Sequence, residues 1–162
     1  MAKEQNIPAI WQTGHDHSSC VEDALAAAHE VCSTKGARLT PLRERILELV
    51  WLTHKPVGAY TLLDLIKLEH NSAAPPTIYR ALDFLMEHGL VHRIKSLNAY
   101  IGCVDPGHDH NVVFLICNEC GSAMEFQNNS VAGRIDAFAA ELGFDLTSQS
   151  VEAAGLCPGC KL

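Results

Sequence analysis

The sequence predicts an α+β protein in two parts: helices that end in a β-hairpin, and then a small α/β unit with a three-stranded sheet. Before residue 90, apolar residues recur at helical spacing in successive segments, and two short strand-like segments follow. Past residue 104 the pattern changes to an unbroken apolar run, which is typical of a buried strand. A chain of 162 residues suits one full domain or two small ones.

The first three helices are predicted from apolar stripes and from the residues that begin and end them. A stripe over 21–35 ends at Gly36, because glycine readily adopts the left-handed conformation that closes a helix. The second helix begins at Thr40 and Pro41, a capping residue followed by a proline at the first helical position. A third helix covers about 59–69. Residues 1–20 show no clear periodicity and are taken as an N-terminal extension.

A fourth helix is predicted from the proline-rich segment at 74–77 to His88, where Gly89 stops it. The apolar residues of its inward face are Ile78, Ala81, Leu82 and Leu85. Its outward face centres on Arg80, with Thr77 and Tyr79 on the flanks. An arginine in that position can bond the N7 and O6 atoms of guanine with both nitrogens of its fork.

Two short strands, about 90–95 and 99–103, follow the fourth helix. Helices followed by a hairpin is the order of a winged helix-turn-helix domain, which would span residues 21–104. In DNA-binding proteins of this kind the recognition helix lies in the major groove, and here it would be the helix before the hairpin. A plain helical bundle covered by a hairpin is the alternative.

A hinge at 105–110 separates this part from a second domain at 111–162. Its strands are predicted at about 112–116, 122–126 and 144–152, with a helix capped by Ser130 before the last strand. A unit of about 55 residues struggles to bury enough surface alone. We therefore expect metal binding or oligomerisation to stabilise it.

The formal net charge of −7 argues against a DNA-binding protein until its distribution is considered. Residues 35–95 contain nine Lys/Arg and six Asp/Glu, whereas residues 96–162 contain two Lys/Arg and eight Asp/Glu. The predicted winged helix is thus mildly basic and the second domain acidic. This balance implies modest non-specific affinity for DNA.

We expect a cytoplasmic protein with no membrane association, because the sequence shows neither a membrane-spanning run nor a signal peptide. No apolar run approaches the ~18 residues of a membrane helix, and the N-terminus has no long apolar stretch of a signal peptide. Seven cysteines in a reducing compartment are better explained by metal binding than by disulfides.

Four of the cysteines form two pairs, each with two residues between the sulfurs: Cys117 with Cys120, and Cys157 with Cys160. Four thiolates in this spacing suit a closed, tetrahedral, structural zinc site. A redox pair or an iron–sulfur cluster is the alternative. One zinc would connect the end of the chain to the strand before Cys117.

A second, looser group lies around the predicted hinge and comprises His92, Cys103, His108, His110 and Glu125. Nitrogen, sulfur and oxygen donors make a mixed site, in which the sulfur favours zinc over iron(II) or manganese(II). Ligands from both domains would fix the angle between them only when metal is bound. Such a site could regulate DNA binding.

Several motifs, in this order along the chain, resemble the ferric uptake regulator family. They are Leu39-Thr40-Pro41-Leu42-Arg43, Pro76-Thr77-Ile78-Tyr79-Arg80-Ala81-Leu82, His108-Asp109-His110 and the Cys117–Gly121 knuckle. The match runs from about residue 21 to 160. The segment Ala153-Ala154-Gly155-Leu156-Cys157 and the thiol at Cys103 are similar to the branch of the family that responds to zinc.

The resemblance implies a homodimer that represses zinc-uptake genes when zinc is plentiful, with one structural and one regulatory zinc per chain. The four paired cysteines would hold the structural zinc. The regulatory ligands would be His92, Cys103, His110 and Glu125, with His108 as a further candidate. Contacts to double-stranded operator DNA would come from Tyr60, Tyr79 and Arg80, and Thr77 flanks the same surface. A third metal site found in many members is expected to be absent, since Glu152-Ala153-Ala154 lacks its histidine.

Three other functions compete with this interpretation. A sibling regulator of the same family would sense iron, manganese or peroxide instead of zinc. A zinc-stabilised adaptor would bind protein and not DNA. An enzyme is not expected, because the zinc deaminases combine a His-x-Glu element with Pro-Cys-x-x-Cys, whereas this chain has His-Asp-His and a leucine before Cys157.

Overall fold

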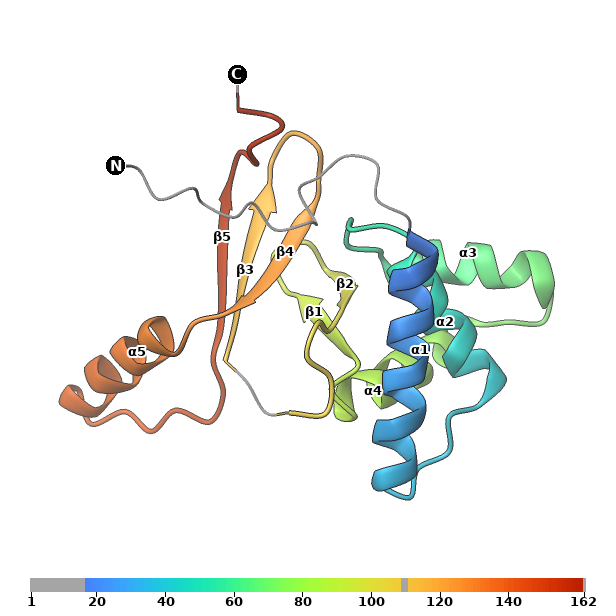
Figure 1. Cartoon of the computed structure of the whole chain (residues 1–162), viewed down its shortest axis with the longest axis horizontal. Coiled ribbons are helices and arrows are strands. Elements are labelled where there is room, and N and C mark those ends of the chain that lie inside the picture. The colour runs from blue at the N-terminus through green and yellow to red at the C-terminus, as the bar shows by residue number, and fades with distance from the viewer. Residues whose placement is uncertain (1–16, 109–110, 162) are drawn as a thin grey trace.

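The computed structural model describes residues 17–108 and 111–161, which form helices, a hairpin and a small mixed sheet. The helices are α1 (His17–Thr34), α2 (Pro41–Trp51), α3 (Ala59–Glu69), α4 (Pro75–Glu87) and α5 (Asn129–Glu141). The strands are β1 (Val91–Ile94), β2 (Ala99–Gly102), β3 (Val112–Cys117), β4 (Ala123–Gln127) and β5 (Ser150–Gly155). Helices α1–α4 lie on one side, the sheet and α5 lie on the other, and the hairpin β1–β2 lies between them (Figure 1). The predicted α+β architecture is therefore confirmed.

The four N-terminal helices share one apolar core, to which each contributes buried apolar residues. In α4 the buried residues are Ile78, Ala81, Leu82 and Leu85, as predicted. Helix α2 begins as expected, with Pro41 in the first turn and the Thr40 hydroxyl accepting a hydrogen bond from the Arg43 N–H. In α3, Leu62, Leu63 and Ile66 are buried, whereas Leu68 is 83% exposed.

The hairpin connects the helical part to the sheet. Strands β1 and β2 are antiparallel, and Ile94 and Ile101 pack with residues of β3 and β4 in a second buried cluster. The sheet has the order β4-β3-β5, in which β3 is antiparallel to β4 and parallel to β5. A backbone hydrogen bond from the Ala123 N–H to the His54 carbonyl, 3.0 Å long, joins β4 to the turn after α2.

The structure differs from the sequence-based expectations at three element boundaries. Helix α1 begins at His17, four residues before the predicted start. The cap of α5 is not Ser130 but Asn128, whose side chain accepts hydrogen bonds from the N–H groups of Ser130 and Val131. The last strand is β5, 150–155, and most of the predicted strand over 144–152 is an exposed loop. The apolar residues in that loop give it the sequence pattern of a strand.

A close contact between Trp51 and Gly102 holds β2 against α2, directly before Cys103. A Cβ atom added at Gly102 would lie 2.1 Å from Cε2 of the Trp51 ring, so any larger residue must displace the ring or the strand. We expect Gly102→Ala to lower the free energy of unfolding by about 1–3 kcal/mol. Gly133→Ala in α5, where nothing lies within 4 Å of the added carbon, is the control. Urea unfolding at equal protein concentrations measures both, and a wild-type value for Gly102→Ala would contradict the contact.

Candidate metal centres and nucleic-acid interface

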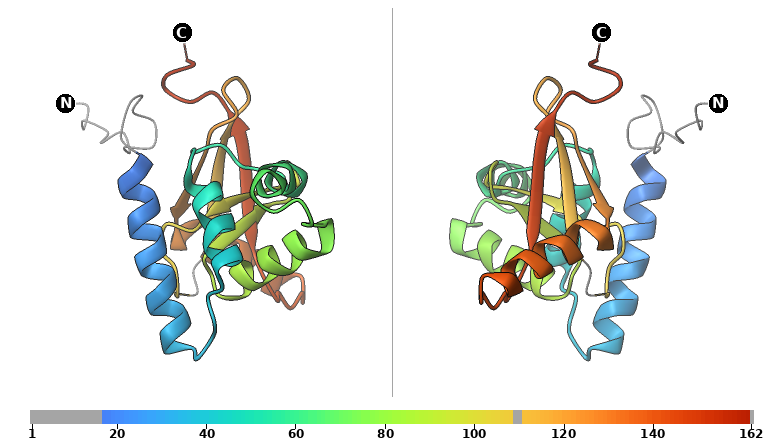
Figure 2. Two further views of the ribbon diagram at one scale, coloured as in Figure 1. Left: turned by 90° about the vertical axis from the view of Figure 1, so that its right-hand side faces the viewer. Right: turned by 90° about the vertical axis from the view of Figure 1, so that its left-hand side faces the viewer.

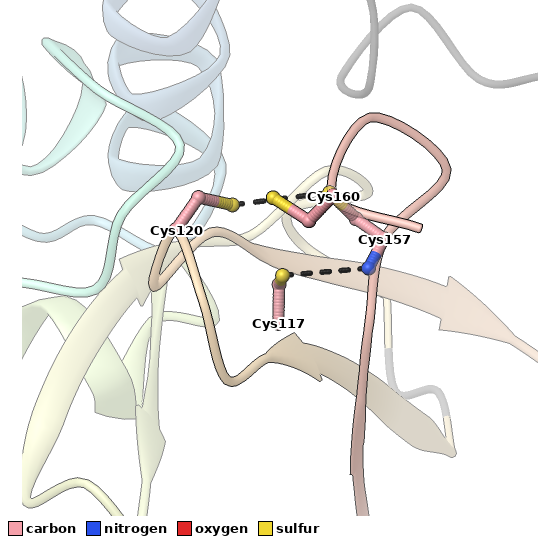
Figure 3. A group of neighbouring side chains, drawn as sticks. All are labelled: Cys117, Cys120, Cys157 and Cys160. Carbon is pink, nitrogen blue, oxygen red and sulfur yellow. Dashed lines mark hydrogen bonds between the residues drawn. The ribbon is translucent and has the colours of Figure 1, made fainter. Parts of the chain in front are cut away.

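The four paired cysteines meet where β3 and β5 end. Cys117 is the last residue of β3 and pairs with Gly155 of the parallel strand β5, so the chain beyond Gly155 passes beside it. The Asn118 N–H donates to the Gly155 carbonyl at 2.8 Å and extends this pairing by one residue. The sulfurs of Cys117, Cys120, Cys157 and Cys160 all lie within 4.8 Å of one another (Figure 3).

Hydrogen bonds at this centre favour ionisation of one cysteine to a thiolate. The close packing of the four sulfurs opposes ionisation of all four unless a cation is bound. Backbone N–H groups, of Cys120 first and then of Cys157, lower the pKa of Cys117, and the Cys157 N–H lies 3.4 Å from its sulfur. The neighbouring thiols, with burial, raise the pKa of Cys160 to about 12. A divalent ion that prefers four sulfur ligands would remove this conflict. The donor set therefore fits zinc.

A second group combines residues of the hairpin and the sheet at the predicted hinge. His92 lies on β1, Cys103 follows β2, and Glu125 lies on β4, and one donor atom of each is within 4.8 Å of the others. His92 Nε2 is 3.3 Å and Cys103 Sγ is 3.9 Å from Glu125 Oε1. The structure thus brings together three of the predicted regulatory ligands.

Glu125 is the one buried charged residue in the described part of the chain: 5% of the residue is exposed, and its side chain is fully buried. Its second oxygen accepts the Val104 N–H at 3.2 Å. Burial, and then the charge of Glu125, raise the pKa of Cys103 to about 12. Buried carboxylates and thiols are costly to ionise together, and a metal ion would compensate both charges. The nitrogen, sulfur and oxygen donors fit zinc chemically.

Of the two hinge histidines, His108 lies among the described residues and His110 does not. His108 is exposed, and its Nδ1 lies 2.9 Å from Asp105 Oδ1. It does not join the group formed by His92, Cys103 and Glu125. His110 lies outside the described residues. The position of the fourth regulatory ligand therefore stays a prediction.

The residues predicted to contact DNA are exposed at the beginning of α3 and along α4. Tyr60 is 65% exposed and Tyr79 is 37% exposed, and Thr77 and Arg80 are exposed beside Tyr79. Phe84, for which the sequence suggests no role, lies beneath the Arg43 guanidinium at 3.5 Å and stacks on His88. Phe84 is thus a packing residue between α2 and α4.

The surface formed by α5 and the loop after it carries large apolar side chains. Phe138 and Phe144 are each 65% exposed, and Leu142 is 83% exposed. With β5, this surface faces away from α1–α4 (Figure 2, right). Helical periodicity identifies this apolar face, but the sequence alone does not show that the rest of the chain leaves it uncovered. Exposed apolar patches of this kind mark interfaces.

These features define a two-part protein: a winged helix with an exposed candidate recognition helix, and a small sheet domain in which four cysteines meet. Three candidate metal ligands lie where the hairpin meets the sheet. Residues 34–154 match the family model described as the ferric uptake regulator family. The chain belongs to this family.

Known relatives and solved structures match over most of the chain. The zinc uptake regulation protein of Escherichia coli strain K12 is 39% identical over 140 residues, which cover 86% of this chain and 82% of the relative. A solved zinc uptake regulator complexed with zinc and DNA superposes with a TM-score of 0.82, at 39% identity and over 86% of this chain and 94% of its own.

A third relative, XcZur, has been solved in a holo and an apo form, which match this chain to different extents. The holo form covers 86% of this chain and 97% of its own at 43% identity, with a TM-score of 0.79. The apo form covers 88% and 98% at 42% identity, with a TM-score of only 0.51. The structure of this chain is therefore more similar to the holo form than to the apo form.

Among the residues that the structure describes, no helix has both the length and the apolar character needed to cross a membrane.

Proposed function

We propose that the chain is a zinc-responsive transcriptional repressor, in which zinc at the hinge favours the form that binds operator DNA. The observation that carries this proposal is the group of His92, Cys103 and Glu125, because two of its members belong to the hairpin and one to the sheet. A metal bound there holds the two parts at a fixed angle. The DNA and zinc in the solved relative support the same assignment.

The hinge group can affect DNA binding because α4 and β1 are almost continuous. Helix α4 ends at Glu87 and β1 begins at Val91, so a rotation of the hairpin on the sheet also turns α4. Zinc supplies a positive centre that accepts the nitrogen, sulfur and oxygen donors. His92 and Cys103 belong to the hairpin and would orient it towards the metal. Glu125 on β4 also accepts the Val104 N–H, which connects the end of the hairpin to the sheet. The difference between the two XcZur matches supports a hinge with two arrangements.

The four-cysteine group has a different proposed role, which is to hold the second domain together for dimerisation. Zinc held by four thiolates would brace the chain end against β3, and two copies of the domain would associate through α5 and the loop after it. Covering Phe138, Leu142 and Phe144 removes a large apolar area from water. We thus propose one structural and one regulatory zinc per chain, in a cytoplasmic homodimer without enzymatic activity.

A comparison of metals tests the proposed function directly. Protein stripped at the hinge is titrated with zinc, iron(II) or manganese(II), and operator binding is followed by fluorescence anisotropy. We expect zinc to restore binding at the lowest free concentration, because the Cys103 thiolate favours it. Restoration by iron(II) or manganese(II) at lower concentrations would assign the protein to a sibling sensor. No DNA binding with any metal would favour an adaptor.

Arg80→Ala tests the placement of α4 in the DNA groove. Loss of a bidentate contact to guanine is expected to cost about 1–3 kcal/mol in operator binding and to relax the preference at one base pair. Arg134→Ala in α5 removes the same charge from an exposed position in the other domain and serves as the control. A quantitative gel shift on both dimeric variants measures the effect. Wild-type affinity for Arg80→Ala would refute this placement.

A further inference from the structure

A carboxylate of the second domain contacts the tip of the hairpin, far along the sequence from it. Glu152 on β5 accepts the Lys95 N–H with Oε1 at 2.7 Å and the Ser96 N–H with Oε2 at 3.1 Å. One carboxylate thus accepts two consecutive backbone amides with its two oxygens. Two such bonds to a charged acceptor fix both the position and the orientation of the turn.

The turn presents these amides because its own hydrogen bonds shape it. The Asn98 N–H donates to the Lys95 carbonyl at 3.2 Å, and Arg93 Nη2 donates to Asn98 Oδ1 at 2.6 Å. Asn98 has a φ of 47°, the left-handed conformation that asparagine tolerates better than most residues. The two amides that face Glu152 therefore belong to a preformed turn.

Glu152 and Glu125 hold the two ends of the hairpin from a single row of the sheet. Phe114 of β3 pairs with Glu125 of β4 on one side and with Glu152 of β5 on the other. Directly paired residues point to the same face of a sheet, and the Phe114 ring on that face contacts His92. Glu125 lies at the base of the hairpin in the metal-ligand group, whereas Glu152 lies at its tip.

We propose that Glu152 is a positioning residue for DNA binding, which sets the orientation of the hairpin and α4 on the second domain independently of metal. This inference rests on the proposed function. Metal at the hinge group holds the base of the hairpin, and Glu152 limits rotation of its tip, so that both contacts are needed for the DNA-binding arrangement. Zinc bound without the Glu152 contact would select that arrangement less completely.

Amide hydrogen exchange of the zinc-loaded full-length protein tests the contact itself. In the wild-type protein, the Lys95 and Ser96 amides are expected to exchange slowly, and in Glu152→Ala they should exchange at least roughly tenfold faster. Glu152→Gln keeps one carbonyl oxygen acceptor and should protect one of them in part. Glu22→Gln, at an exposed carboxyl of α1, removes the same charge and should leave both amides protected. Equal exchange in the wild type and Glu152→Ala would overturn the proposal.

Operator titration of the same variants tests the positioning role. At saturating zinc, Glu152→Ala is expected to bind the operator roughly fivefold to tenfold more weakly, with Glu152→Gln between it and the wild type. Ser96→Pro removes one of the two amide donors at a turn position that accepts proline. Its loss of operator affinity should be less than additive with that of Glu152→Ala, because both changes remove the same contact. Unchanged affinity in Glu152→Ala, with both amides exposed, would make the contact merely structural. A wild type that binds no operator would refute the proposed function, while exchange would still test the contact.

Discussion

A Cys160→Ser variant is expected to lose its tightly held zinc and its dimeric state together. Binding of a structural zinc is coupled to folding of the domain that holds it, and structural zinc sites contribute about 10–16 kcal/mol at neutral pH. Cys160 is only half-buried, so the exchange of sulfur for oxygen disturbs little packing. Zinc content by mass spectrometry and molecular mass by light scattering, both after mild chelation, measure the result.

Cys20→Ser is the matched control for this experiment, because Cys20 lies on α1, outside both metal-ligand groups. It should remain a dimer with about one zinc per chain after the same chelation. If Cys160→Ser also kept full zinc and a dimeric mass, the four cysteines would not form a structural site.

A Cys103→Ser variant is expected to stay folded, dimeric and loaded at the four-cysteine site, yet to fail to bind operator at low free zinc. Loss of even an outer partner of a metal ligand costs about 10–100-fold in affinity, so loss of the thiolate should cost at least as much. The preference for zinc over manganese should also weaken, since the sulfur selects zinc. Operator titrations at buffered zinc and manganese measure both effects.

The outcome for Cys103→Ser separates a sensor from a structural site. Full operator binding at low free zinc would exclude Cys103 as a regulatory ligand. Unfolding or loss of the dimer would instead assign Cys103 to the stability of the hairpin. Cys20→Ser again controls for the loss of a thiol, and it should bind operator with wild-type zinc dependence.

The elements that the sequence predicts well are those with a strong local pattern. The inward face of α4 follows from a period of 3.6 residues, and Pro41 and Gly89 mark helix ends by their backbone preferences. The four cysteines are equally local, because each pair is defined by its spacing. Their convergence depends on the fold, through the pairing of Cys117 with Gly155.

Other features depend on contacts that no local pattern reveals. Phe144 and Leu146 resemble part of a strand in sequence, but they lie in a loop before β5. The sequence pattern does not separate the two cases, because a dimer interface and a buried strand favour the same apolar residue types. The contact of Glu152 with the hairpin joins residues 57 positions apart. His108 has the right residue type near the right place, and only the structure shows that it lies beside Asp105.

In the proposed mechanism, binding of zinc at the hinge and binding of DNA to α4 are energetically coupled. The measurement is a titration of hinge zinc in the wild-type dimer, with and without a saturating concentration of operator DNA. Linkage requires operator to tighten zinc binding by the same factor by which zinc tightens operator binding, a factor of about 5–150 for typical coupling. We expect the two factors to be equal. The same zinc affinity in both titrations would contradict it and show that the group of His92, Cys103 and Glu125 does not regulate DNA binding.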